Sequence, residues 1–330
     1  MKKLLVPMLA GALALAGVST ASVAADPIKL QIKWVTQSQF AGYYVAKSKG
    51  YYTDEGLDVT ILPGGPNVAP EQVIAGGGAD VIVDWAGGAL VAREKGVKLV
   101  NIAQPFNHAG LELICPKDGP IKTEADFPGH TLGVWFFGNE YPFFAWMHKL
   151  GYSTDGGPKG VTVLKQNFDV SALVQKQADC ISVMTYNELG QAADAGFTAD
   201  KIIQFNYTDM GNDLLEDGLW ALQDRLADPK FKDDMVKFVR ASMKGWDYAL
   251  KNPDEAAKIV VDSDDSGAAN IKHERYMVGE VTKLMAGANG VLDKKVWDRT
   301  VKALEDQKIL TKPVDPEAFT TEITDAAVKK

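Results

Sequence analysis

Aromatic and amide side chains stand where expected strands of this chain pass into helices. Trp34 closes an alternating strand, and Gln39 and Tyr43 lie early in the helix that follows. Asp84 closes another strand, which is apolar throughout. Aromatic faces stack on flat rings, whereas amides and carboxylates form hydrogen bonds to the edge of a ring. These residue types are suited to holding a planar molecule.

The same pattern returns in the middle of the chain. Trp135 closes a strand, and Asn139 lies in the segment that leads to the next helix. Tyr186 and Glu188 follow a further strand. A carboxylate such as Glu188 accepts hydrogen bonds from amino groups and ring N–H groups. Basic residues are scarce at these junctions, so a nitrogen-rich heterocycle is favoured over a phosphate or a sulfonate.

Several of these residues also have a structural explanation. Trp34 could cap the core, and Tyr43 lies in a helix that must bury one face. Asn139 could act as a helix N-cap. Glu188 could be favoured in the first turn of a helix by the helix dipole. Residue type alone leaves both explanations open.

Signatures of catalysis and of cofactor binding are missing from the sequence. It contains no phosphate-binding P-loop, no Gly-x-Ser-x-Gly and no His-Glu-x-x-His, and its four histidines lack metal-ligand spacing. We therefore expect no catalytic residue, no metal and no cofactor. The net charge of −8, from 35 basic and 43 acidic residues, argues against nucleic acid or an anionic membrane surface as the partner.

Strand and helix patterns alternate through the first two thirds of the chain, which predicts α/β lobes with parallel sheets. The pattern restarts after the expected strand of residues 111–115, so we expect two such lobes. Ligands of open α/β sheets bind beyond the carboxyl ends of the strands, where the junctions described above would face one cleft. The expected strands span residues 28–34, 57–62, 80–84, 99–104, 111–115, 131–136, 161–165 and 180–184. The expected helices span residues 37–49, 70–75, 88–95, 123–127, 140–149, 170–178 and 189–195.

The chain becomes mostly helical from about residue 228. No strand pattern is visible there, so we expect this block to pack around the first lobe rather than to form a third sheet. The expected helices of the block span residues 230–252, 253–262, 273–284 and 294–307.

Residues 1–25 have the pattern of a secretory signal peptide. Lys2 and Lys3 precede an apolar run that is too short to span a bilayer, and small residues follow it. We expect its removal and export to the periplasm. Cys115 and Cys180 could pair in that oxidising compartment. Both lie in apolar, strand-like surroundings, however, and we expect two separate buried thiols.

Two segments near the N-terminus carry a family resemblance. Trp34…Gln39-Phe-Ala-Gly-Tyr-Tyr-Val-Ala46 and Gly50-Tyr-Tyr-Thr-Asp-Glu-Gly-Leu-Asp-Val-Thr-Ile61 resemble the periplasmic substrate-binding proteins of ABC importers, and more narrowly the ThiY-like branch, which is related to yeast thiamine-pyrimidine synthases. The resemblance implies a type II periplasmic-binding fold, in which two lobes joined by two crossovers close on a ligand. It implies a first lobe of residues 26–108 and 215–330, and a second lobe of residues 109–214.

The resemblance also implies a ligand and partners. ThiY-like members bind formylated aminopyrimidines with the ring stacked on aromatics and a Glu at its edge, and Trp34 and Glu188 occupy matching positions. The chain would deliver a thiamine pyrimidine precursor to an ABC permease and its ATPase, and we expect a monomer. Riboflavin or another flat heterocycle stays open as ligand, as does a sensor that binds a membrane receptor. A pyrimidine synthase is disfavoured because the cysteine-rich iron motif and active-site histidine of the yeast enzymes are not evident.

Overall fold

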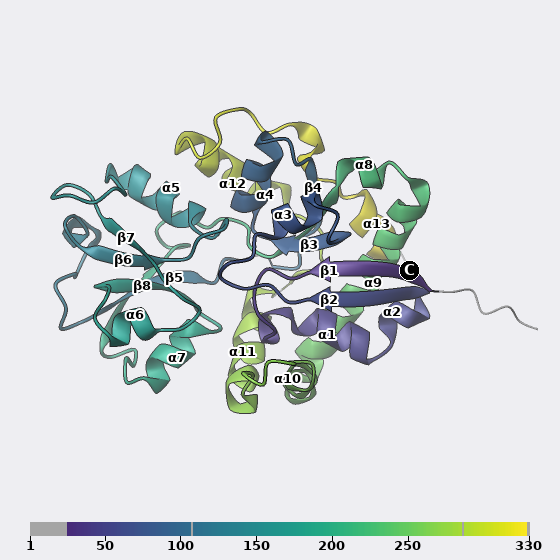
Figure 1. Cartoon of the computed structure of the whole chain (residues 1–330), viewed down its shortest axis with the longest axis horizontal. Coiled ribbons are helices and arrows are strands. Elements are labelled where there is room, and N and C mark those ends of the chain that lie inside the picture. The colour runs from purple at the N-terminus through teal and green to yellow at the C-terminus, as the bar shows by residue number, and fades with distance from the viewer. Residues whose placement is uncertain (1–24, 107, 286, 329–330) are drawn as a thin grey trace, which may run out of the picture.

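Two five-stranded sheets organise the part of the chain that the computed structural model describes, residues 25–106, 108–285 and 287–328. Each sheet and the helices around it form one lobe, and the two lobes lie side by side (Figure 1). The predicted signal peptide lies outside the described residues, apart from residue 25. In these described ranges, no helix is long and apolar enough to cross a membrane.

The sheet of the first lobe has the strand order β2-β1-β3-β10-β4. β1 pairs in parallel with β2 and β3, whereas β10 is antiparallel to both β3 and β4. The strands are β1 Asp26–Gln31, β2 Leu57–Leu62, β3 Val81–Asp84, β4 Leu99–Ala103 and β10 Gly218–Leu222.

The sheet of the second lobe has the order β7-β6-β8-β5-β9. β6 pairs in parallel with β7 and β8, whereas β5 is antiparallel to β8 and β9. The strands are β5 Leu111–Pro116, β6 Thr131–Val134, β7 Thr162–Lys165, β8 Cys180–Met184 and β9 Ile202–Asn206.

Both sheets are therefore mixed, and the prediction of parallel sheets is wrong for one strand in each. The two exceptions, β5 and β10, are the first strands after the chain passes from one lobe to the other. Among the described residues, no helix lies between β4 and β5 or between β9 and β10, whereas a parallel neighbour is usually reached through a crossover helix. The predicted lobe boundaries fall inside these two connections, and their exact positions stay a prediction.

Most predicted helices are present, with shifted ends. The helix expected over residues 170–178 is a single turn, because Lys176 adopts a left-handed φ of +56° that ends the helical path. In the first lobe the helices before β4 are η1 Ser38–Phe40, α1 Ala41–Ser48, α2 Tyr51–Asp54, α3 Pro70–Ala75 and α4 Ala86–Glu94. In the second lobe they are η2 Glu124–Asp126, α5 Tyr141–Leu150, α6 Ser171–Val174 and α7 Glu188–Asp194.

The C-terminal block is helical and packs mainly on the first lobe, as expected. Its longest helix, α9, begins at Pro229 after an Asp228 side chain that accepts a hydrogen bond from a backbone N–H of the first turn. α9 packs against α1, where Gly42 leaves the space that Trp246 fills. The block comprises α8 Gln223–Leu226, α9 Pro229–Lys251, α10 Pro253–Asp262, α11 Ile271–Leu284, α12 Lys294–Asp306, η3 Pro316–Ala318 and α13 Glu322–Val328.

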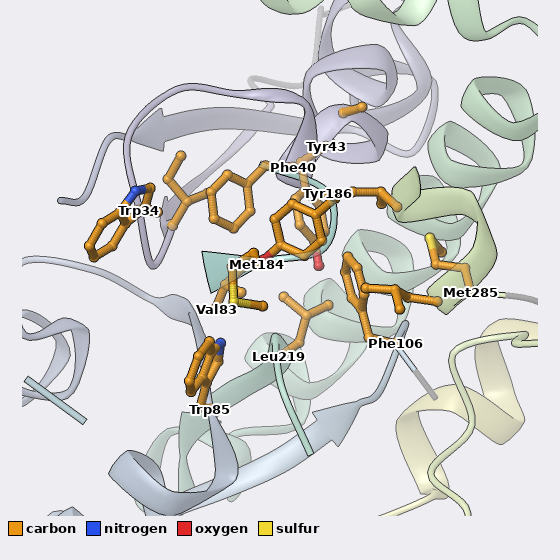
Figure 2. Close-up of a cluster of buried hydrophobic side chains, with 14 of the residues drawn as sticks. Trp34, Phe40, Tyr43, Val83, Trp85, Phe106, Met184, Tyr186, Leu219 and Met285 are labelled. Atoms are coloured by element: carbon orange, nitrogen blue, oxygen red, sulfur yellow. The ribbon is translucent and has the colours of Figure 1, made fainter. Parts of the chain in front are cut away.

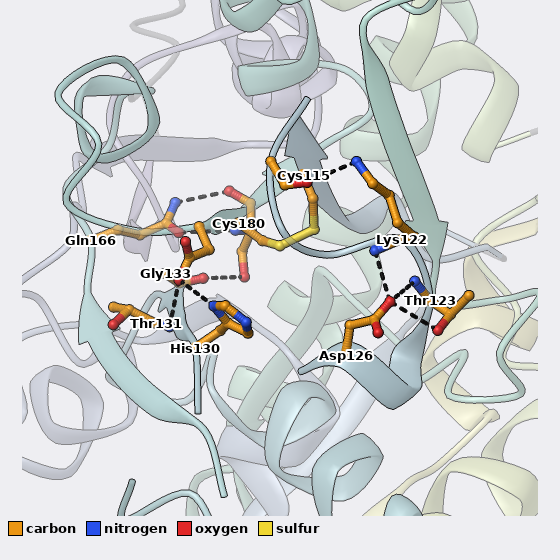
Figure 3. Close-up of a disulfide and its surroundings, with 12 residues drawn as sticks. Cys115, Lys122, Thr123, Asp126, His130, Thr131, Gly133, Gln166 and Cys180 are labelled. Atoms are coloured by element: carbon orange, nitrogen blue, oxygen red, sulfur yellow. Dashed lines mark hydrogen bonds and ion pairs between the residues drawn. A yellow bond between two sulfur atoms is a disulfide. The ribbon is translucent and has the colours of Figure 1, made fainter. Parts of the chain in front are cut away.

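A disulfide joins Cys115 of β5 to Cys180 of β8 (Figure 3). The expectation of two separate thiols is wrong. β5 and β8 are antiparallel neighbours with Ile114 opposite Ile181, so this register places the two cysteines opposite each other, with Cα atoms 4.3 Å apart. That separation lies at the short limit for a disulfide, and it depends on the pairing of two strands whose cysteines lie 65 residues apart in sequence.

Candidate functional site

A small cavity lies between the two lobes, beyond the carboxyl ends of strands from both sheets. Trp85 directly follows β3, Trp135 directly follows β6, and Met184 ends β8. The first lobe contributes side chains from the segments after β1 and β3, and the second lobe from those after β6 and β8. The lining residues are Lys33, Trp34, Gln37, Gln39, Trp85, Trp135, Asn139, Met184, Tyr186 and Glu188.

Aromatic rings from both lobes form much of the cavity wall. Trp34 of the first lobe and Trp135 of the second meet edge to face, with ring centroids 5.8 Å apart and an angle of 66° between the planes. Trp85 and Tyr186 belong to the same buried cluster (Figure 2). Edge-to-face contact is a favourable arrangement of two aromatic rings, so the two indoles can hold the lobes together while they bound the cavity.

The amides of the first lobe are held in place by a buried carboxylate. Gln37 Nε2 donates to Gln39 Oε1 (2.8 Å), and Gln39 Nε2 donates to Asp217 Oδ2 (2.7 Å). Asp217 Oδ1 accepts from the indole N–H of Trp85 (3.1 Å). Asp217 is the residue before β10, and burial raises the pKa of its carboxyl to about 6. This wall of the cavity is therefore preorganised by groups of its own lobe.

The second lobe presents a carboxylate whose hydrogen-bond partners are uncharged. Glu188 Oε2 accepts from the backbone N–H of Met184 (3.0 Å), and its Oε1 accepts from Asn187 Nδ2 (2.7 Å). The side chain is 1% exposed, and burial raises its pKa to about 7. A carboxylate can accept about four hydrogen bonds, so Glu188 retains capacity for a donor in the cavity.

The lysine of the cavity is paired with an acid. Lys33 Nζ lies 2.5 Å from Asp84 Oδ1, and both side chains are buried. Burial alone would lower the pKa of Lys33, but the adjacent charge of Asp84 holds this pKa above its usual value. The ammonium therefore stays protonated and largely neutralised, which leaves little positive charge for an anionic ligand.

Six of the eight residues predicted for the site line the cavity, namely Trp34, Gln39, Trp135, Asn139, Tyr186 and Glu188. The other two lie outside the lining. Asp84 lies behind Lys33 as its ion-pair partner. Tyr43 is fully buried against Trp246, with ring centroids 5.7 Å apart, because its position on α1 faces α9.

Four lining residues were not among the predicted site residues. Gln37 and Trp85 stand at the same strand-to-helix junctions as predicted residues, so the signal was present in the sequence. Met184 ends an apolar strand and resembles any core residue. Lys33 occupies a position that the alternation of the strand predicts to be exposed to solvent. It was therefore not expected to line a buried cavity, but in the fold it is 2% exposed.

Comparison with known proteins agrees with this architecture. The NMT1/THI5-like family profile matches residues 37–256, more than half of the chain. The formylaminopyrimidine-binding protein of Halalkalibacterium halodurans is 25% identical over 315 residues, which cover 92% of each chain. The riboflavin-binding protein RibY of Chloroflexus aurantiacus is 26% identical over 308 residues, which cover 89% of this chain and 85% of RibY.

A solved structure extends the likeness to the whole fold. The ligand-binding component of an ABC-type import system from Staphylococcus aureus matches with a TM-score of 0.67 at 13% identity, covering 92% of this chain and 100% of that one. At this identity the likeness concerns the fold alone, and it confirms the two-lobed periplasmic-binding fold that the resemblance implied. With this fold and with the family match over two thirds of its length, the chain belongs to the NMT1/THI5-like family.

Proposed function

We propose that this chain is the solute-binding component of an ABC importer and that it binds a thiamine pyrimidine precursor of the formylaminopyrimidine or hydroxymethylpyrimidine type. One observation carries the proposal. The cavity between the lobes combines aromatic rings from both sides with the buried carboxylate of Glu188, which no cation neutralises among the residues that line the cavity.

The chemistry of the cavity supports an aminopyrimidine. A flat ring can stack on the indole of Trp34 or of Trp135 and meet the other indole with its edge. An exocyclic amino group or a ring N–H can donate to Glu188, and the amides of Gln37 and Asn139 can satisfy further edge atoms. The relative from Halalkalibacterium halodurans, whose name describes a formylaminopyrimidine-binding protein, points to the same class of ligand.

Riboflavin is the second candidate, because RibY is about equally similar to this chain. An isoalloxazine would use the same stacking surfaces. Riboflavin carries three fused rings and a ribityl chain, so it would need a longer cavity than a single pyrimidine ring.

Binding and closure form the whole mechanism in this proposal. A ligand that contacts both lobes stabilises the closed arrangement, which a permease can then recognise. The chain would be exported to the periplasm after removal of the predicted signal peptide, and the permease with its ATPase would be its partners. The protein itself would carry out no chemical step.

A panel of compounds tests the ligand assignment. Isothermal calorimetry and thermal shift are measured with formylaminopyrimidine, hydroxymethylpyrimidine, thiamine, riboflavin, taurine and nitrate. A ligand at 100 times its Kd should raise the free energy of unfolding by about 2.7 kcal/mol. We expect this shift with a pyrimidine. A shift with taurine alone would contradict the proposal, and a shift with riboflavin alone would favour the second candidate.

A further inference from the structure

One lysine side chain joins the two lobes at the edge of the cavity. Lys33 Nζ donates to Asp84 Oδ1 in its own lobe and to the backbone carbonyl of Phe137 in the second lobe, at 3.1 Å. Hydrogen bonds from a charged donor are about twice as strong as neutral ones, and they gain further strength away from water. The bond to Phe137 exists only while the lobes are together.

The loop that accepts this bond is under conformational strain. Phe137 has a φ of +60°, which is unfavourable for a residue with a bulky side chain, and Gly138 follows with a φ of +92°. The same loop carries Trp135 and Asn139, both of which line the cavity. Lys33 therefore holds a strained loop of the second lobe in the position that completes the cavity.

The steric fit at this contact is tight for any side chain larger than that of glycine. A Cβ atom on Gly138 would lie 3.1 Å from Lys33 Nζ and 3.2 Å from the Cα of Gly88. A Cβ atom on Gly87 would lie 3.0 Å from the Cβ of Tyr141, across the cleft. Glycine inside a helix lowers the stability of the helix by roughly 1 kcal/mol relative to alanine. The close approach of the second lobe accounts for two successive glycines in α4.

Acidic groups from both lobes face the Lys33 ammonium. Asp84 and Glu71 come from the first lobe, and Glu140 comes from the loop before α5 in the second lobe. Tyr141, also of the second lobe, faces the same three carboxyls. Closure brings Glu140 toward the two acids of the first lobe, and like charges repel each other in a medium of low polarity. The positive charge of Lys33 offsets that repulsion.

We propose that Lys33 is a positioning residue that couples closure of the lobes to completion of the cavity, through its simultaneous bonds to Asp84 and to the Phe137 carbonyl. Any effect on ligand affinity rests on the function proposed above. The effect on closure does not, because it concerns contacts between the two lobes of this chain alone.

Distances between spin labels test the proposal. Labels are placed on cysteines introduced at the exposed positions Asp54 and Asp118, one in each lobe, in the full chain. Closure is driven in two independent ways: by saturating formylaminopyrimidine and, without ligand, by trimethylamine oxide, which favours burial of surface. We expect Lys33→Met to lower the ratio of closed to open molecules by roughly tenfold in both cases. Lys33→Arg, which keeps the charge and the donors, should restore most of it.

Two further variants keep the test decisive. Lys33→Met with Asp84→Asn removes both charges, so no unpaired buried charge threatens the fold, and it should open the lobes like the single variant. Gly87→Ala places a methyl group against Tyr141 without changing any charge, and it shows how a purely steric change at this contact affects the distances. A Lys33→Met protein that closes like wild type in trimethylamine oxide would overturn the proposal. If wild type closes in trimethylamine oxide but not with formylaminopyrimidine, the proposed ligand fails, and the result for Lys33 stands.

Discussion

The two lobes share a plan of five mixed strands with one antiparallel strand each, yet they are stabilised in different ways. The first lobe gains α9 and α13 from the C-terminal block, and Trp246 of α9 fills the space above Gly42. The second lobe has no comparable block and instead carries the Cys115–Cys180 disulfide between neighbouring strands. Similar topologies can thus be stabilised by additional buried surface or by a covalent bond that restricts the unfolded chain.

The lobes also differ in what they bring to the cavity. The first lobe fixes its lining side chains through the buried carboxylates of Asp84 and Asp217. The second lobe offers Glu188, whose partners are a backbone N–H and an amide. We infer that the first lobe supplies a preformed wall, whereas the second supplies an acceptor that a ligand can complete. Three experiments can break or sharpen this comparison.

The largest effect is expected from removal of the disulfide. Cys115→Ser with Cys180→Ser opens a loop of 65 residues, and the free energy of unfolding should fall by about 4 kcal/mol. The loss should be confined to the second lobe, with the first lobe still protected. Hydrogen exchange followed by mass spectrometry in denaturant resolves the two lobes. Equal loss of protection in both lobes would show that they unfold as one unit.

The second effect concerns pH. Glu188 has a pKa of about 7 in the fold against 4.5 ordinarily, so the folded state holds the proton more tightly than the unfolded state. The free energy of unfolding should therefore fall as the pH rises from about 4.5 to 7, by about 3 kcal/mol, and this contribution should be constant above pH 7. Glu188→Gln should remove this part of the slope in denaturant titrations. An unchanged slope in Glu188→Gln would contradict the burial argument.

The smallest effect is expected from the indoles. Stacking of a ring on an aromatic side chain contributes about 1–3 kcal/mol, so Trp34→Ala should weaken pyrimidine binding by roughly tenfold to hundredfold in calorimetry. Trp135→Ala should also lower the melting temperature, because the Trp135 indole N–H donates to the backbone carbonyl of Asn167 (2.8 Å). Trp297→Phe, in the core of the first lobe, is the matched control and should leave affinity unchanged. Full affinity in Trp34→Ala would remove this ring from the proposed binding surface.

Much of the cavity could be predicted from positions along the chain. Trp135 directly follows β6 and Glu188 lies four residues beyond the end of β8, and the ends of such strands meet at one edge of each sheet. Tyr43 shows the limit of that reasoning. It lies close to Gln39 in sequence, but a helix turns successive side chains to different faces, and its own face is covered by Trp246.

The sequence by itself determined the α/β class, the family, the helical character of the C-terminal block and most of the strand ends that surround the cavity. These features follow from local periodicity and residue type, which report whether a segment forms a helix or a strand and which face it buries. They do not report which segments become neighbours.

Only the tertiary structure decided which strands and which side chains of the chain pair with one another. The direction of β5 and β10, the pairing of Cys115 with Cys180 and the ion pair of Lys33 with Asp84 all depend on which strands lie side by side. Lys33 has the spacing of an exposed residue, yet it is buried because Asp84, 51 positions away, neutralises its charge. Burial of a charge requires a partner in space, and the choice of that partner is a property of the whole fold.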